Sequence, residues 1–147
     1  MRLTTYSDYS MRVLLYLGAR KDQLCSVAEI ARAYGISQNH LTKVVHGLGK
    51  AGFISSVRGR AGGIRLARPA DEIVLGAVMR ETEDDFELVD CGHCALSGAC
   101  GLACALDEAT AAFMAVLDSY TLADLLGRRR QMLNLFSQTS VPLPMAN

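Results

Sequence analysis

The stretch SVAEIARAYGISQNHLTKVVHGLGKAG, residues 26–52, predicts two short helices joined by a tight turn. Ser26 and Glu29 have the spacing of a capping box, in which each side chain accepts a hydrogen bond from the other residue's free backbone N–H group. Gly35 is placed to end the first helix, because glycine readily adopts the left-handed conformation found after many helices, and Ser37 can cap the second. Two helices joined by such a turn are typical of a helix-turn-helix.

The flanking residues complete a winged helix. Apolar side chains recur at helical spacing over 5–20, which predicts a first helix. Two short strands are predicted at 53–57 and 64–67, and the segment RGRAGG at 58–63 has the glycine content of a hairpin tip. We therefore expect a mainly α protein whose residues 1–70 form a winged helix-turn-helix domain with a β-hairpin wing.

The charged residues divide the chain into a basic and an acidic part. Residues 1–70 carry eleven Lys and Arg against three Asp and Glu, whereas residues 71–126 carry twelve acidic residues and a single base, Arg80. A basic module joined to an acidic one indicates an anionic partner for the first part only. Together with the helix-turn-helix and the wing, this division predicts binding to a double-stranded DNA operator.

The predicted second helix of the helix-turn-helix would present polar side chains to the major groove. Amide side chains there can read adenine through two hydrogen bonds, and arginines on a glycine-rich wing can reach phosphates or a minor groove. The predicted DNA contacts are Ser37, Gln38, Asn39, His40 and Lys43 on the recognition helix, and Arg58 and Arg60 on the wing.

The second half of the chain is predicted to hold a connecting segment and a pairing helix. Residues 71–100 contain a short helix, an acidic run and most of a cysteine cluster. From Leu102 to Tyr120, apolar residues recur in alternating steps of four and three, a narrow seam that suits pairing with another helix in a homodimer. We expect residues 101–136 to form this dimerisation helix and further C-terminal helices, and residues 137–147 to form a loose tail.

The stretch CGHCALSGACGLAC, residues 91–104, gathers four of the five cysteines. The chain begins like an amphipathic helix rather than a signal peptide, and no segment has the length of a membrane span, so we expect a cytoplasmic protein that binds no membrane. Clustered thiols in that compartment more often bind metal or do redox chemistry than form disulfides. The spacings suit zinc and an iron-sulfur cluster equally, and a metal-free thiol switch is a third alternative.

A catalytic role for the thiols is disfavoured. Cys91 and Cys94 have the C-x2-C spacing of dithiol oxidoreductases, but no thioredoxin-like alternation of strands and helices surrounds them. We therefore expect a regulator and no enzyme. Cys25, outside the cluster, has the character of a small buried hydrophobic residue.

Three segments carry a resemblance to a known family: MRLTTYSDYSMRVLLYL at the start, ISQNHLTKVVHGLGKAGFISSVRGRAGGIRLARPA in the DNA module, and LDSYTLADLL after the cysteines. The chain resembles the NsrR repressors, which belong to the winged-helix regulator family that also includes IscR and RirA. This resemblance implies a homodimeric repressor that senses nitric oxide through an iron-sulfur cluster. It also implies ligation by three cysteines, matched here by Cys91, Cys94 and Cys100, and by an aspartate of the partner subunit's first helix, matched by Asp8.

The chain also departs from the family pattern. Cys91 and Cys94 are closer in sequence than the first two cysteines of most members, and Cys104 is additional, so Cys104 could replace Cys94 or Asp8 in the ligand set. IscR-type ligation is disfavoured because His93 lies inside the cluster rather than after its last cysteine. We expect a 4Fe-4S cluster, with 2Fe-2S as the alternative. The alternative functions are an iron or redox sensor of the same fold and a zinc-stapled winged-helix regulator.

Overall fold

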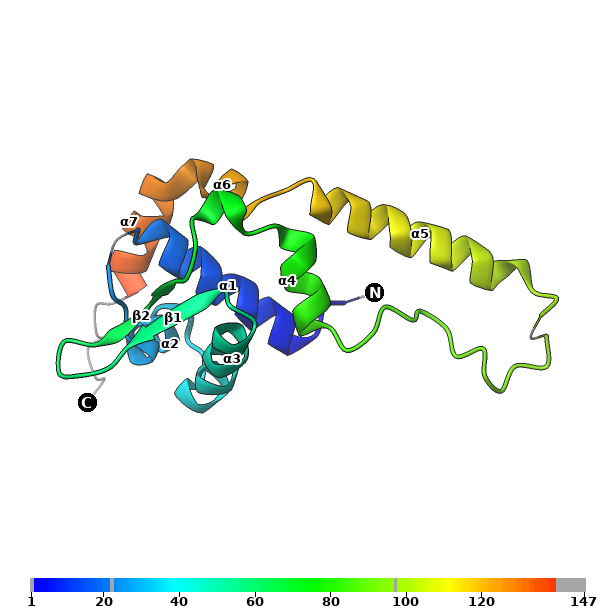
Figure 1. Cartoon of the computed structure of the whole chain (residues 1–147), viewed down its shortest axis with the longest axis horizontal. Coiled ribbons are helices and arrows are strands. Elements are labelled where there is room, and N and C mark those ends of the chain that lie inside the picture. Colours follow the sequence, from blue (N-terminus) through cyan, green and yellow to red (C-terminus); the bar gives the residue numbers. More distant parts are fainter. Residues whose placement is uncertain (1, 22, 97, 140–147) are drawn as a thin grey trace, which may run out of the picture.

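The computed structural model describes residues 2–21, 23–96 and 98–139. A helical body carries a two-stranded hairpin at one end, and a long helix with its preceding loop projects from the other as an arm (Figure 1). In chain order the elements are α1 (Thr5–Ala19), α2 (Val27–Tyr34), α3 (Gln38–Lys50), β1 (Ile54–Val57), β2 (Gly63–Leu66), η1 (Ala70–Glu72), α4 (Leu75–Thr82), α5 (Gly101–Asp118), α6 (Leu122–Leu125), η2 (Leu126–Arg128) and α7 (Arg129–Thr139).

The predicted helix-turn-helix is confirmed as α2 and α3. The Ser26 hydroxyl accepts a hydrogen bond from the Glu29 N–H at 3.1 Å, and the Glu29 carboxylate accepts one from the Ser26 N–H at 2.8 Å. Gly35 follows α2 with φ of 63°, in the left-handed region. Ser37 does occupy the N-cap position of α3, but its side chain caps no N–H group of that helix, so the predicted side-chain cap is wrong.

The hydrophobic core of the body forms around α1. Val13, Leu14 and Tyr16 of this helix are at most 1% exposed. The C-terminal helix α7 closes the core, because its Phe136 ring lies with its centroid 4.8 Å from that of Tyr16 and 5.5 Å from that of Tyr34. The helices α6 and α7 therefore pack onto the DNA module, although they are far from it in sequence.

The wing is an antiparallel pair in which Ser55 lies opposite Arg65 and Val57 opposite Gly63. Each strand begins one residue from the predicted range: β1 starts after Phe53, and β2 starts at Gly63. Cys25 extends the sheet through two backbone hydrogen bonds with Ile64, and its side chain is 2% exposed, as predicted for a buried residue. A side chain at position 63 would approach the Cys25 carbonyl to 2.9 Å, so glycine permits this pairing.

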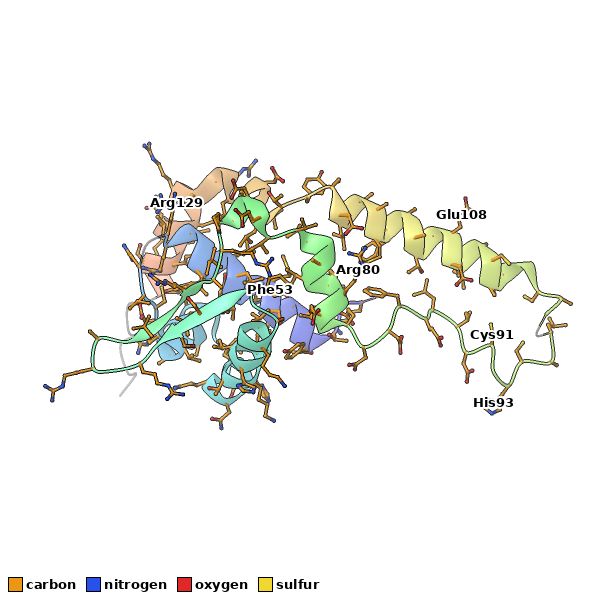
Figure 2. The ribbon with its side chains drawn as sticks, in the orientation of Figure 1. Phe53, Arg80, Cys91, His93, Glu108 and Arg129 are labelled. Carbon is orange, nitrogen blue, oxygen red and sulfur yellow. The ribbon has the colours of Figure 1, made fainter. Side chains whose placement is uncertain are left out.

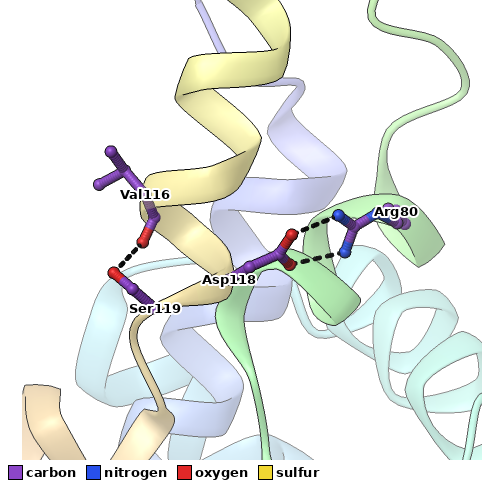
Figure 3. A network of polar contacts seen from close by, with 4 residues as sticks. All are labelled: Arg80, Val116, Asp118 and Ser119. Atoms are coloured by element: carbon purple, nitrogen blue, oxygen red, sulfur yellow. Dashed lines mark hydrogen bonds and ion pairs between the residues drawn. The ribbon is translucent and has the colours of Figure 1, made fainter.

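The arm consists of α5 and the loop that precedes it, residues 83–100, here called the cysteine loop. The arm is anchored where the last residues of α5 meet α4 (Figure 3). There the Arg80 guanidinium donates two hydrogen bonds to the Asp118 carboxylate, at 2.7 and 2.6 Å. Gly76 lies beside this pair, and a side chain at that position would overlap the Asp118 carboxylate.

After α5, a capping box of Thr121 and Asp124 begins α6, as predicted. Helix α7 continues to Thr139, three residues past the predicted end at Phe136, so residues 137–139 are helical rather than part of a loose tail. The other residues of the predicted tail, 140–147, lie outside the described part of the chain. Among the described helices, none combines the length and the apolar composition needed to cross a membrane.

Candidate DNA interface and cysteine site

Helix α3 separates an apolar inner face from a polar outer face. Leu41, Val44 and Leu48 are at most 2% exposed and hold the helix against the core. Gly47 allows close contact with α1, because a side chain there would overlap the Tyr6 hydroxyl. All five residues predicted to contact DNA from this helix and its N-cap are exposed: Ser37, Gln38, Asn39, His40 and Lys43.

The wing residues Arg58 and Arg60 are exposed as well, at the tip of the hairpin. Gly59 between them has φ of 117°, a conformation that side-chain-bearing residues rarely adopt. Among the described residues, no ion pair involves Lys43, Arg58 or Arg60. These three cations are therefore available to an anionic partner, and the structure places them on α3 and on the wing that follows it.

Three of the four clustered cysteines line one pocket of about 340 Å³. Cys91 and Cys94 come from the cysteine loop, and Cys100 occupies the N-cap position of α5. Cys104, one turn into α5, does not line the pocket and is exposed. The remaining wall is largely apolar and is formed by Val89, Leu96, Leu102 and Ala103, with Asp90 and Gly98.

The cysteine pocket contains an acidic residue, Asp90, beside its thiols. Burial raises the pKa of the Cys91 thiol, and so do the nearby Cys94, Cys100 and Asp90. His93 is almost fully exposed, and its Nδ1 lies 3.8 Å from an Asp90 carboxylate oxygen. Figure 2 shows Cys91 and His93 on the arm, at the end of the molecule away from Arg129.

The donor set of this pocket fits an iron-sulfur cluster. Cys91, Cys94 and Cys100 line one cavity, and thiolates are the usual ligands of such clusters. In the described part of the chain, no three Cys, His, Asp or Glu side chains are gathered to hold a single metal ion. A cavity of about 340 Å³ has room for a group of several atoms, and apart from the three cysteines its wall is largely apolar.

Asp8 lies in the first turn of α1 and is not brought to the cysteine pocket of its own chain. Its Oδ1 accepts a hydrogen bond from Arg12 Nε at 3.0 Å, and its Oδ2 forms an ion pair with Arg12 Nη2 at 2.9 Å. Sequence reasoning missed this partner, although an acid and an arginine four residues apart on a helix are a recognisable pair. Both side chains are close to half exposed, so the pair faces the surface.

Sequence reasoning also missed a hydrogen-bonded junction between α1 and the start of the cysteine loop. The Glu83 carboxylate accepts hydrogen bonds from the Thr4 N–H at 2.8 Å and from the Thr4 hydroxyl at 3.2 Å. The Ser7 hydroxyl, fully buried, donates to the Thr82 hydroxyl at 2.9 Å, and Thr82 donates to the Val78 carbonyl at 3.0 Å. No sequence signal links these pairs, which are 79 and 75 residues apart.

Residues 3–128 match the Rrf2 family, described as iron-dependent transcriptional regulators. The HTH-type transcriptional regulator NsrR of Geobacillus kaustophilus is 49% identical over 144 residues, covering 94% of this chain and 98% of the relative. NsrR of Bacillus subtilis is 46% identical over 141 residues, covering 92% and 97%.

Two solved structures have a similar fold and 27% identity to this chain. CymR, the global cysteine regulator of B. subtilis, has a TM-score of 0.74, covering 87% of this chain and 98% of its own. IscR of T. potens has a TM-score of 0.73, covering 87% and 88%. These matches are to transcriptional regulators and agree with the winged helix and the exposed recognition helix described above. The chain therefore belongs to the Rrf2 family of transcriptional regulators and, within it, to the NsrR-type members.

Proposed function

We propose that the chain is a cytoplasmic repressor that binds an operator in double-stranded DNA as a homodimer and releases it when nitric oxide reacts with its iron-sulfur cluster. The observation that carries this proposal is that Cys91, Cys94 and Cys100 line one pocket, in a chain whose recognition helix and wing have exposed polar faces. The NsrR relatives favour nitric oxide as the signal over iron or a general oxidant.

In this proposal, Cys91, Cys94 and Cys100 hold a cluster of the 4Fe-4S type, and Asp8 of the partner subunit supplies the fourth ligand. A bound cluster supplies iron atoms that react with nitric oxide. A carboxylate is a harder ligand than a thiolate, so Asp8 would be the most exchangeable of the four. Both of its oxygens contact Arg12 in the structure, so ligation competes with that pair.

Dimerisation through α5 is part of the proposal and is supported by the exposure of the predicted seam. Met114 is the single buried residue of this 18-residue helix. Along the seam, Leu102 is 56% exposed and Val116 57%, and Tyr120, two residues beyond the end of α5, is 46% exposed. Large apolar side chains exposed along one helix indicate an interface. A two-fold dimer would also present two recognition helices to a palindromic operator.

The hydrogen-bonded junction suggests how the cysteine loop influences DNA binding. Helix α4 is joined to α1 by Ser7 and Thr82 and to α5 by Arg80 and Asp118, so it holds both ends of the arm. Helix α1 in turn packs against α3 where Tyr6 meets Gly47. A change in the loop therefore has a continuous packed route to the recognition helix, and the buried hydroxyl pair is one contact on it.

This route predicts that Thr82→Val will weaken the dependence of DNA binding on the state of the cluster. Valine keeps the shape of threonine but removes the hydroxyl that accepts from Ser7, and a buried hydrogen bond of this kind is worth about 1 kcal/mol. We expect normal cluster content. We also expect the ratio of operator affinities before and after nitric oxide treatment to fall by roughly three- to tenfold, measured by fluorescence anisotropy on anaerobic samples.

The control for this experiment is Ser119→Ala, which removes a hydroxyl hydrogen bond of 2.7 Å to the Val116 carbonyl at the exposed end of α5. It should leave the affinity ratio unchanged. If Thr82→Val lowers the melting temperature but keeps the full ratio, the hydroxyl pair only stabilises the fold.

The DNA interface predicts a strong dependence of operator affinity on salt. If Lys43 and Arg58 contact phosphates, replacing either with Gln should reduce the slope of log affinity against log salt concentration by roughly one unit. The slope is measured by titrating labelled operator at several potassium chloride concentrations. Arg128→Gln, an exposed cation on the C-terminal side of the body, is the control and should keep the wild-type slope. If the wild type and the three variants have equal slopes, Lys43 and Arg58 do not contact DNA phosphates.

A further inference from the structure

A second pocket, of about 690 Å³, lies outside both the DNA interface and the cysteine pocket. It is bounded by the end of α1, by β2 and the residues that follow it, and by the segment from α6 to α7. Figure 1 shows α6 and α7 on the side of the hairpin opposite to α3. Five cations and one carboxylate line it: Arg20, Lys21, Arg65, Arg68, Arg129 and Asp71.

The cations of this pocket lack matching acids in the described part of the chain. No ion pair is formed there by any of the five. Arg129 uses its Nε to donate a hydrogen bond of 2.6 Å to the Ala19 carbonyl at the end of α1, which fixes its stem at the pocket wall. Like charges gathered around one cavity repel one another, so the arrangement favours an anionic occupant.

Arg20 lines the pocket and is fixed in position by its neighbours. Its Nε is buried and has no hydrogen-bond partner among the described residues. Its guanidinium lies over the Tyr16 ring, with Cζ 4.5 Å from the centroid, so the side chain is held in place by an aromatic contact. The charge of Arg20 is therefore held at a fixed position where this residue lines the pocket.

We propose that this cationic pocket binds a small organic phosphate of about nucleotide size. The planar guanidinium groups of arginine match the oxygens of a phosphate, and four of the five cations are arginines. The volume lies in the range of about 300–1,000 Å³ that small-molecule sites occupy. Leu17, Leu66 and Leu126 provide an apolar wall for the rest of the molecule.

Such a ligand would join parts of the fold that are distant in sequence. It would contact α1 and β2 of the DNA module on one side and Leu126 and Arg129 of the C-terminal segment on the other. Because it binds the folded state only, it would raise the melting temperature. The site would be a second input to the regulator, independent of the cysteine pocket.

The test uses the full chain with three probes at constant ionic strength: adenosine monophosphate, inorganic pyrophosphate and citrate. Binding is measured by calorimetry and by the shift in melting temperature. We expect saturable binding of adenosine monophosphate with one site per chain, weaker binding of pyrophosphate, which lacks an apolar part, and no binding of citrate.

Arg65→Gln, at an exposed position of β2, should weaken the binding of adenosine monophosphate by about tenfold, because one charge-assisted contact is lost. Arg20→Gln should do the same.

The matched control is Arg58→Gln, which removes the same charge from the same hairpin at its tip and should bind adenosine monophosphate like the wild type. Three results would overturn the proposal. The first is no saturable binding of either phosphate probe. The second is an equal loss in Arg58→Gln and Arg65→Gln, which would indicate unspecific attraction. The third is a reduced salt slope for operator binding in Arg65→Gln, which would make the pocket a DNA-backbone contact.

Discussion

Cys94→Ser is expected to remove the iron-sulfur cluster, and Cys104→Ser is expected to leave it in place. Both cysteines are exposed and lie in the same short stretch, but Cys94 lines the pocket with Cys91 and Cys100, whereas Cys104 does not. A serine hydroxyl is a poor replacement for a thiolate as a ligand of iron in a cluster. Absorption spectra with iron and sulfide analysis after anaerobic purification measure the cluster content, which we expect to fall more than tenfold in Cys94→Ser.

Cys25→Ala is the control for these variants, because Cys25 is buried and pairs with Ile64 of β2, a strand that Figure 1 shows at the end of the molecule away from α5. It should keep both cluster and operator binding. Loss of the cluster in Cys104→Ser would place Cys104 in the ligand set instead of Cys94 or Asp8. A colourless, zinc-containing wild type would contradict the sensor proposal and favour the zinc-stapled alternative, while leaving the DNA interface intact.

The parts of the fold that the sequence predicts depend on local physical rules. The capping boxes at Ser26 and Thr121 satisfy backbone N–H groups within one helical turn. Gly35 adopts the left-handed backbone conformation that ends α2. Each of these features can be recognised from neighbouring residues in the sequence. Ser37 shows the limit of such rules. A serine at the right position is necessary for a side-chain cap but does not fix its rotamer, and here its hydroxyl caps nothing.

The parts that could not be predicted depend on contacts between distant segments. The pairing of Ser7 with Thr82 and the double hydrogen bond from Arg80 to Asp118 join residues 75 and 38 positions apart, and neither pair has a periodicity or motif. The cysteines are an intermediate case. Their spacing predicts a ligand set but not its members, because that choice depends on where α5 begins. With Cys100 at its N-cap, Cys104 is one turn along the helix, outside the pocket.

Ala109→Glu is expected to convert the proposed dimer into a monomer and to weaken operator binding by two orders of magnitude or more. Ala109 lies at the middle of the predicted seam of α5 and is exposed in the single chain. A glutamate there would place two like charges close together across a two-fold interface, in apolar surroundings that cannot solvate them. A dimer gains from binding two half-sites at once, an advantage of about 10²- to 10⁴-fold that a monomer loses.

Ala111→Glu provides a matched control for this prediction. It makes the same substitution in the same helix, also at an exposed position, but two residues further along it lies on the opposite face from the seam. Light scattering after size exclusion should show a dimer for Ala111→Glu and a monomer for Ala109→Glu, and titration of labelled operator should separate the two variants in affinity. Cluster content adds a second readout: if Asp8 of the partner subunit is a ligand, the monomeric variant should hold its cluster less firmly than the control. If both variants are dimers with equal operator affinity, this face of α5 is not the dimer interface. Ligation by Asp8 of the partner subunit would then require a dimer formed through a different surface.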